Sequence, residues 1–115
     1  MYCKNSDDFE KNNIPKTVNA QISVLTPSVD KDFIVRKIKL ASGGSMPNHT
    51  NKIQHQQYVL SGEAKVVVAD ETYHAKQVDI KYPPAGVNYY YEAIYNCDYE
   101  FLCMITTQDD EITML

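Results

Sequence analysis

Short β-rich segments separated by turn residues are the feature that most constrains how this sequence can fold. Branched and aromatic residues dominate these segments, which span residues 17–26, 32–40, 56–60, 63–69, 72–76, 78–82, 87–94 and 99–106. Glycine, proline, asparagine and aspartate lie between them, which is the composition of turns. Short strands at near-regular spacing are typical of β-sandwiches and β-barrels, and no heptad or long helical period competes with them. The sequence therefore predicts an all-β fold.

The length of 115 residues predicts a single domain. Residues 1–13 are rich in Asn, Asp and Lys, and we expect a flexible N-terminal tail or a short arm there. The folded domain is expected to span residues 14–107, and an acidic stretch begins a C-terminal tail at 108–115. Inside the domain, the small and flexible residues at 41–45 predict a loop.

The charge balance limits the class of partner. A net charge of −4 and a pI near 5.2 argue against binding to nucleic acid or to an anionic membrane, both of which need a basic surface. No window approaches the roughly 18 apolar residues of a membrane-spanning helix, and the N-terminus lacks the apolar core of a secretory signal. The three cysteines have no metal-binding spacing. We expect a cytoplasmic protein whose partner is a small molecule.

Polar side chains gather between residues 43 and 62. His49 and Asn51 are two residues apart, so they share a face if their segment is extended. His55 precedes the apolar run 56–60, and residues 63–69 are expected to return as the second strand of a hairpin. Two imidazoles and a carboxamide on neighbouring strands can converge on one small volume, which would fit a metal ion or a small polar ligand.

The spacing of these residues resembles the two signatures of the cupin superfamily over about residues 32–106. The positions of the first signature fall on Gly43, His49, Asn51, His55 and Gly62. Those of the second fall on Val78, Pro84, Gly86, Tyr89 and Ala93. The resemblance implies a cupin-type jelly-roll β-barrel with a ligand cavity at its mouth.

The resemblance also implies a metal site, and here the sequence departs from the family. Cupins use three histidines and a glutamate, whereas the same four positions hold His49, Asn51, His55 and Tyr89. Two imidazoles suit Fe, Zn, Ni, Mn or Cu, so one divalent transition metal remains one interpretation. The alternative is that the pocket persists and binds no metal.

Roles for the individual residues follow from the resemblance. Tyr89 and His55 are the candidate catalytic residues, with the Tyr89 hydroxyl as a proton donor if it is not a ligand. Asn51, Gln57 and Tyr91 are candidate ligand-binding residues, although aromatic packing in a strand explains Tyr91 better than ligand binding does. Cys103 is expected to be a small buried residue, and spacing does not show whether it meets a histidine.

Two functions from different classes follow. The first is a metal-dependent enzyme of the isomerase, lyase or dioxygenase type, acting on a small polar molecule. The second is a metal-free cupin that serves as a ligand-binding or accessory module, so whether the chain is an enzyme stays open. Small cupins pair their N-terminal strands, which predicts a homodimer in which residues 17–26 cover an exposed edge.

Overall fold

The computed structural model describes residues 1–27, 32–106 and 112–115. Three predictions fall outside the described residues. They are the turn after Pro27, the domain boundary at 107 and the acidic stretch 108–111. One short 3-10 helix, η1 (Ser6–Asp8), precedes the strands. The described strands are β1 (Asn12–Asn13), β2 (Val18–Val24), β3 (Phe33–Asn51), β4 (Gln56–Ser61), β5 (Glu63–Val68), β6 (Glu71–Lys76), β7 (Ile80–Lys81), β8 (Tyr89–Ala93), β9 (Tyr99–Thr106) and β10 (Ile112–Met114).

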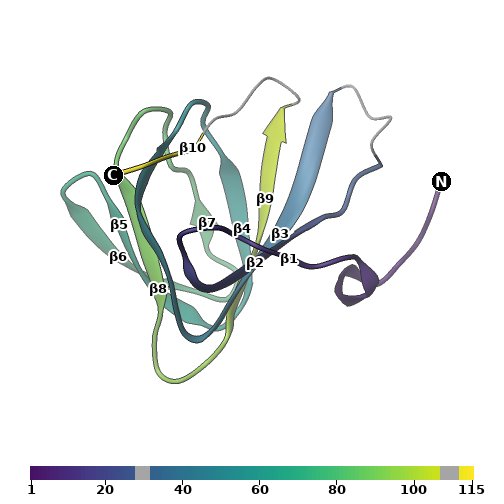
Figure 1. Ribbon diagram of the computed structural model, residues 1–115, viewed down its shortest axis with the longest axis horizontal. Coiled ribbons are helices and arrows are strands. Elements are labelled where there is room, and N and C mark those ends of the chain that lie inside the picture. The colour runs from purple at the N-terminus through teal and green to yellow at the C-terminus, as the bar shows by residue number, and fades with distance from the viewer. Residues whose placement is uncertain (28–31, 107–111) are drawn as a thin grey trace.

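The strands form a nearly closed antiparallel β-barrel, which confirms the predicted all-β, cupin-type fold (Figure 1). The strand order is β6-β5-β8-β3-β9-β4-β7, so among the described residues β6 and β7 are the two edges where the barrel stays open. Strand β3 belongs to both halves of the barrel. Its first part pairs with β9 from Phe33 to Leu40, and its second part pairs with β8 from Ser45 to His49.

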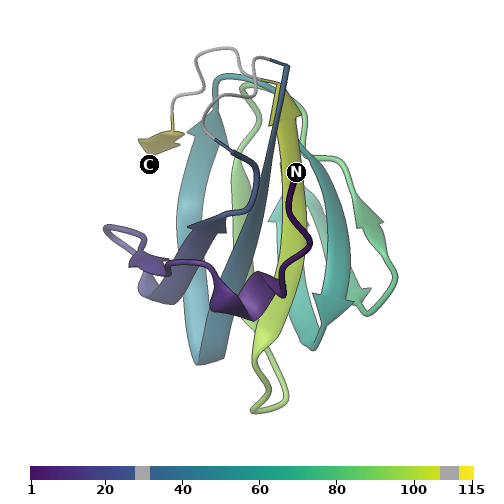
Figure 2. The same cartoon turned by 90° about the vertical axis from the view of Figure 1, so that its right-hand side faces the viewer.

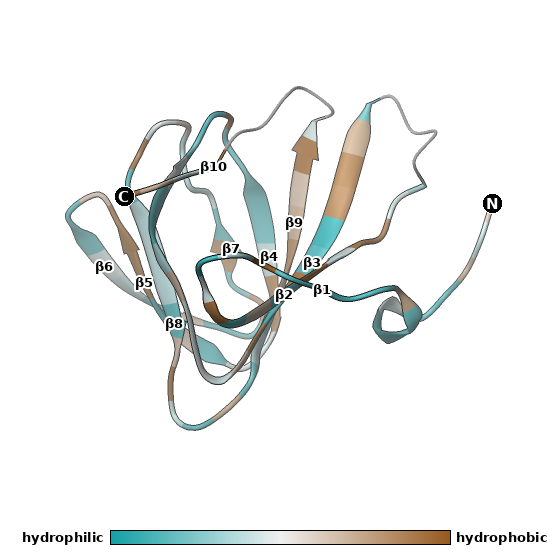
Figure 3. Cartoon of the chain, in the orientation of Figure 1, coloured by the Kyte–Doolittle hydropathy of each residue, from teal (hydrophilic) through white to brown (hydrophobic). Residues whose placement is uncertain are grey.

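Alternating burial along the strands places the core inside the barrel. Tyr99, Phe101, Cys103 and Ile105 of β9 are buried, and the residues between them are partly exposed. This period of two is what a pleated strand with one face on the core requires. The hydropathy colouring shows hydrophobic stretches on β5 and β9 and a hydrophilic start of β4 (Figure 3). The buried residues of β4 are Gln57 and Val59, so this strand adds one polar side chain to a mainly apolar interior.

The loop predicted at residues 41–45 is wrong, because β3 runs through it as part of one 19-residue strand. The glycines that suggested a loop lie instead at a bend within this strand. Gly43 adopts φ +78°, and a Cβ on Gly44 would lie 2.8 Å from the carbonyl oxygens of Val18 and Ala41. The small residues let β3 turn from one half of the barrel to the other while β2 packs closely against it.

The glycine positions of the cupin signatures are explained by backbone conformation. Gly43, Gly62 and Gly86 all have φ between +73° and +78°. Val78 stands at the fourth such position and has φ +76°, although a β-branched residue is strained in that region. The fold thus keeps the same left-handed backbone at position 78 even where the glycine is replaced.

The N-terminal segment lies across the barrel surface (Figure 2). Strand β1 pairs with β2, and the buried Lys37 of β3 forms an ion pair with Asp7 and a hydrogen bond to Ser6 Oγ. At the other end of the chain, β10 pairs with β3 at residues 49–51. Parts of both expected tails therefore pack against the strand that carries His49 and Asn51.

None of the described helical residues forms a stretch long and apolar enough to cross a membrane. The predicted homodimer and cytoplasmic location stay predictions.

Candidate functional site

A cavity of about 120 Å³ lies inside the barrel beneath the N-terminal segment; we call it the barrel cavity. It is lined by Asn13, Ile14, Pro15, Ile22, Arg36, Ile38, Met46, His49, Asn51, His55, Gln57, Tyr89, Tyr91 and Ile112. All six of the polar or aromatic residues singled out from the sequence, His49, Asn51, His55, Gln57, Tyr89 and Tyr91, are among them. The shared face expected for His49 and Asn51 is confirmed, because both are buried and line this one cavity.

His49 is held by its own strand. Its Nδ1 lies 2.8 Å from the carbonyl oxygen of Pro47, and its ring lies 5.1 Å from the ring of Tyr89. A carbonyl can only accept a hydrogen bond, so Nδ1 carries the proton. In a neutral ring, Nε2 is then the nitrogen with the lone pair, and it can accept a hydrogen bond or bind a metal ion.

Two buried polar atoms of the barrel cavity have no hydrogen-bond partner among the described residues. One is the acceptor Oδ1 of Asn51, whose side chain is 3% exposed. The other is the donor Nε of Arg36. A buried polar atom left unpaired costs about 1–3 kcal/mol, so a bound water or another small polar molecule is expected beside such an atom. A molecule that both accepts and donates hydrogen bonds would satisfy the pair.

Cys103 is the centre of a buried hydrogen-bond cluster. Its Sγ lies 3.4 Å from His55 Nδ1 and 3.3 Å from Arg36 Nη2, and Gln57 Nε2 donates to it over 3.7 Å. Burial raises the pKa of the Cys103 thiol, but the hydrogen bond with His55 and the charge of Arg36 outweigh it, so the pKa is lowered. The contacts with His55 and Arg36 therefore make Cys103 easier to ionise than an ordinary thiol.

Tyr89 continues this cluster toward β7. Its hydroxyl donates to Gln57 Oε1 at 2.8 Å and accepts from Lys81 Nζ at 3.1 Å. Burial raises the pKa of Tyr89 well above its usual range, and the nearby hydroxyls of Tyr91 and Tyr99 add to the effect. Tyr89 is therefore a neutral phenol whose hydroxyl is already engaged on both sides.

The residues present do not fit the metal site that the cupin resemblance implies. Among the described residues, no three His, Cys, Asp or Glu side chains come together as a group that could hold a metal ion. Tyr89 resists the deprotonation that a phenolate ligand requires. The guanidinium of Arg36 lines the same cavity and would repel a divalent cation. We therefore derive no chemical step through a metal.

Arg36 and Lys81 were not among the predicted site residues. The spacing of Cys103 did not show whether it contacts a histidine. Arg36 has a signal in hindsight, because it lies on the same strand face as Ile34, Ile38 and Leu40. A lone charge on an apolar face of a strand indicates a polar interior. The sequence pattern points the wrong way for Lys81. The alternation in 78–82 predicts that the apolar residues face inside, whereas in the structure Ile80 is exposed and Lys81 is buried.

Comparisons with known proteins give a fold. Neither the search against protein-family models nor the search of curated proteins finds a match. Among solved structures, the polyketide cyclase RemF from Streptomyces resistomycificus superposes with a TM-score of 0.90 at 17% identity, covering 100% of this chain and 85% of that one. A cupin-2 domain from Rhodospirillum rubrum gives 0.81 at 17% identity over 93% of this chain and 72% of its own.

KdgF from Halomonas sp. gives a TM-score of 0.74 at 14% identity, with 90% of each chain covered. These likenesses extend over nearly the whole chain, and they agree with the nearly closed barrel and with the signature positions described above. The chain has the fold of a small cupin domain.

Proposed function

We propose that the chain binds a small carboxylic acid in its barrel cavity, without a metal, and that Arg36 and Asn51 hold it. The observation that carries the proposal is the pair of buried atoms without partners, Arg36 Nε and Asn51 Oδ1, on residues that line one cavity. A carboxylate accepts from the guanidinium, which is the geometry that arginine favours. A hydroxyl or protonated group elsewhere on the same molecule would donate to Asn51.

The size of the cavity limits the ligand. Its volume of about 120 Å³ is well below the roughly 300–1,000 Å³ that drug-sized ligands occupy. A molecule of a few non-hydrogen atoms, such as a short hydroxy or keto acid, suits this space. His49 Nε2 could also accept a hydrogen bond from such a ligand, since its Nδ1 proton is held by Pro47.

A catalytic role for the same cavity is the second candidate, and the contact between Cys103 and His55 favours it. Cys103 Sγ lies 3.4 Å from His55 Nδ1, and the lowered pKa of the thiol would let the two side chains exchange a proton beside the bound acid. Tyr89 would then serve as a fixed hydrogen-bonding group. The chemistry would be a proton transfer of the isomerase or lyase type. Neighbours whose names include a polyketide cyclase and KdgF support a cupin that acts on small molecules.

Replacing Arg36 by methionine is expected to weaken carboxylate binding by about 10–100-fold, because a hydrogen bond to a charged group contributes about 1.5–3 kcal/mol. Isothermal titration calorimetry with acetate, pyruvate and malonate measures the change. Asn51→Leu should weaken binding of pyruvate or of a hydroxy acid by a smaller factor. Lys39→Met, on the exposed side of the same strand, is the matched control. Equal affinities for the control and for Arg36→Met would overturn the proposal.

A further inference from the structure

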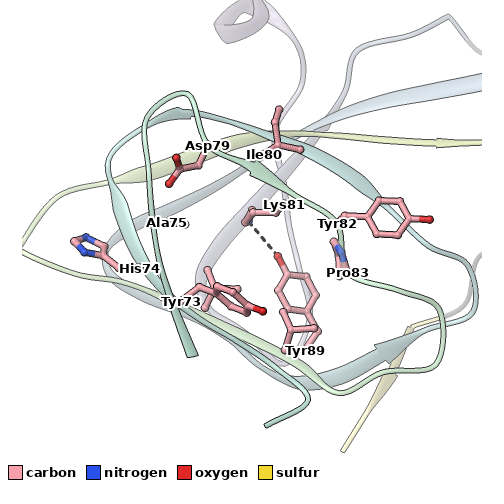
Figure 4. Close-up of a pocket in the computed structure, with 11 residues that line it drawn as sticks. Tyr73, His74, Ala75, Asp79, Ile80, Lys81, Tyr82, Pro83 and Tyr89 are labelled. Atoms are coloured by element: carbon pink, nitrogen blue, oxygen red, sulfur yellow. Dashed lines mark hydrogen bonds between the residues drawn. The ribbon is translucent and has the colours of Figure 1, made fainter. Parts of the chain in front are cut away.

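A second and larger hollow lies where the barrel stays open, between the edge strands β6 and β7; we call it the β6–β7 slot (Figure 4). It has a volume of about 350 Å³ and is lined by Val66, Val68, Tyr73, His74, Ala75, Asp79, Ile80, Lys81, Tyr82, Pro83 and Tyr89. Tyr89 is the residue that it shares with the barrel cavity. The slot reaches the size range of ordinary ligand sites.

The walls of the slot combine apolar residues such as Val66, Ala75 and Tyr73 with the polar His74, Asp79 and Lys81. Tyr73 is 53% exposed, and Ile80 and Tyr82, 70% and 57% exposed, lie at the rim with their side chains directed away from Lys81. The usual orientation of side chains is reversed in strand β7: the apolar Ile80 faces solvent, and the charged Lys81 is only 9% exposed. Exposed apolar side chains around a hollow mark a site for an apolar molecule.

Lys81 is the functional group of the slot. Its Nζ has one hydrogen-bond partner among the described residues, the Tyr89 hydroxyl, and no described carboxylate lies within 4.0 Å to form an ion pair. The aromatic rings around Nζ are Phe101 at 3.5 Å, Tyr99 at 4.9 Å, Tyr91 at 5.0 Å and Tyr89 at 5.8 Å. Other titratable groups near it are Cys103 of β9 and, along the slot, His74 and Asp79.

These surroundings favour a neutral amine. Ring contacts favour the ammonium form, but the cost of removing an ammonium from water is larger than this gain. Burial accordingly lowers the pKa of Lys81 well below its usual range. The amine donates a proton to the Tyr89 oxygen, so that hydrogen bond does not use its lone pair.

We propose that the β6–β7 slot is a binding site for an apolar aldehyde or ketone, and that Lys81 Nζ forms an imine with its carbonyl carbon. The Nζ lone pair attacks that carbon, a C–N bond forms as the C=O π bond breaks, and one proton moves from the nitrogen to the oxygen to give a carbinolamine. The C–O bond then breaks, the hydroxyl leaves as water with the second proton from the nitrogen, and the C=N bond remains. Amine and carbonyl compound thus become imine and water, with no oxidant or reductant.

Tyr89 positions the amine for this step. Its hydroxyl accepts a hydrogen bond from Nζ over 3.1 Å and donates its own proton to Gln57, so it holds Nζ in place within the slot. Figure 4 shows Lys81 and Tyr89 directed toward one another within the slot. Tyr89→Phe removes this hydrogen-bond partner and should therefore slow imine formation, because Nζ loses the contact that holds it.

Reductive alkylation tests the proposal. The full-length protein is incubated at pH 7 with benzaldehyde and sodium cyanoborohydride, and the modified lysines are located by peptide mapping over time. We expect Lys81 to be alkylated at least about 10-fold faster than the exposed Lys65 and Lys76, because each unit of lowered pKa raises the neutral fraction about 10-fold. The preference should shrink above pH 10, where all lysines lose their protons.

The comparison among lysines of one protein needs no variant, so it holds even if a substitution impairs folding. Lys81→Met should remove the fast phase of alkylation, and Lys76→Met should leave it unchanged. Alkylation of Lys81 at or below the rate of Lys65 and Lys76 would overturn the proposal. So would a fast phase that persists in Lys81→Met.

Discussion

Replacing Lys81 by methionine is expected to raise the free energy of unfolding at neutral pH and to flatten its dependence on pH. In the wild-type chain, burial lowers the pKa of Lys81 well below its usual range, whereas the unfolded chain binds a proton there until about pH 10.4. Between these two pKa values the unfolded state binds more protons, so the wild-type stability rises with pH by up to about 1.4 kcal/mol per pH unit for one group. Methionine carries no proton, so this contribution disappears.

Urea unfolding at a series of pH values from 6 to about 9.5 measures the difference. Cys103 also raises stability with pH in part of this window, because its lowered pKa leaves the unfolded thiol as the better proton binder near its usual value. Subtracting the Lys81→Met curve from the wild-type curve isolates the lysine. Lys76→Met, which removes an exposed lysine of β6, should keep the wild-type slope. Parallel curves for the wild type and Lys81→Met would contradict a neutral Lys81.

Above pH 10 the slope is expected to reverse. Burial raises the pKa values of Tyr89, Tyr91 and Tyr99, so their phenols stay protonated in the folded state while they ionise in the unfolded chain. The folded state then binds more protons, and stability falls as pH rises.

Replacing Gly62 by alanine is expected to cost more than about 3 kcal/mol of stability and to impair folding. Gly62 joins β4 to β5 with φ +77°, and a Cβ there would lie 1.9 Å from the carbonyl oxygen of Asp98. That oxygen belongs to the backbone, so it cannot move aside as a flexible side chain would. The clash therefore adds to the strain of a left-handed alanine.

Gly86→Ala separates the two contributions. Gly86 has a similar φ of +73°, but nothing lies within 4 Å of the position that a Cβ would take. We expect a loss of about 1 kcal/mol from the backbone conformation alone. Thermal and urea unfolding of both variants gives the comparison. Similar losses for the two glycines would show that the contact with Asp98 does not limit this turn.

The fold could be predicted because its determinants are local. Turn residues separate the strands, and Gly43, Gly62 and Gly86 occupy the positions where the backbone needs positive φ. The period of two then placed His49 and Asn51 on one buried face. The bend of β3 could not be predicted, because the residues 41–45 have a loop composition and are kept in a strand by the pairing of β2 and β8 on either side.

The site could be predicted only in part, because its contacts join residues far apart in the sequence. Cys103 and His55 are 48 positions apart, and Arg36 and Cys103 are 67 apart, so no spacing rule links them. The inversion of β7 is a tertiary effect as well. Lys81 turns inward to reach Tyr89, and Ile80 is left at the rim of the slot.

One chain of contacts connects the barrel cavity to the slot. Lys81 donates to Tyr89, Tyr89 donates to Gln57, and Gln57 donates to Cys103, which also accepts from Arg36. A ligand that takes the Arg36 hydrogen bond away from Cys103 Sγ would leave the sulfur, the last acceptor of this chain, with one donor fewer. The two hollows are therefore linked by one chain of hydrogen bonds, although we propose different ligands for them.

The central claim is that the barrel cavity binds a carboxylate through Arg36, and nitrogen-15 NMR tests it most directly. Arg36 is the only arginine in the sequence, so its Nε–H gives a single assigned signal. Titration with acetate, pyruvate and malonate is predicted to shift that signal saturably, as the buried Nε gains an acceptor. A signal that stays unchanged throughout the titration would contradict the claim. A perturbation of the His49 and His55 rings by one equivalent of zinc in the same sample would point to a metal site in its place.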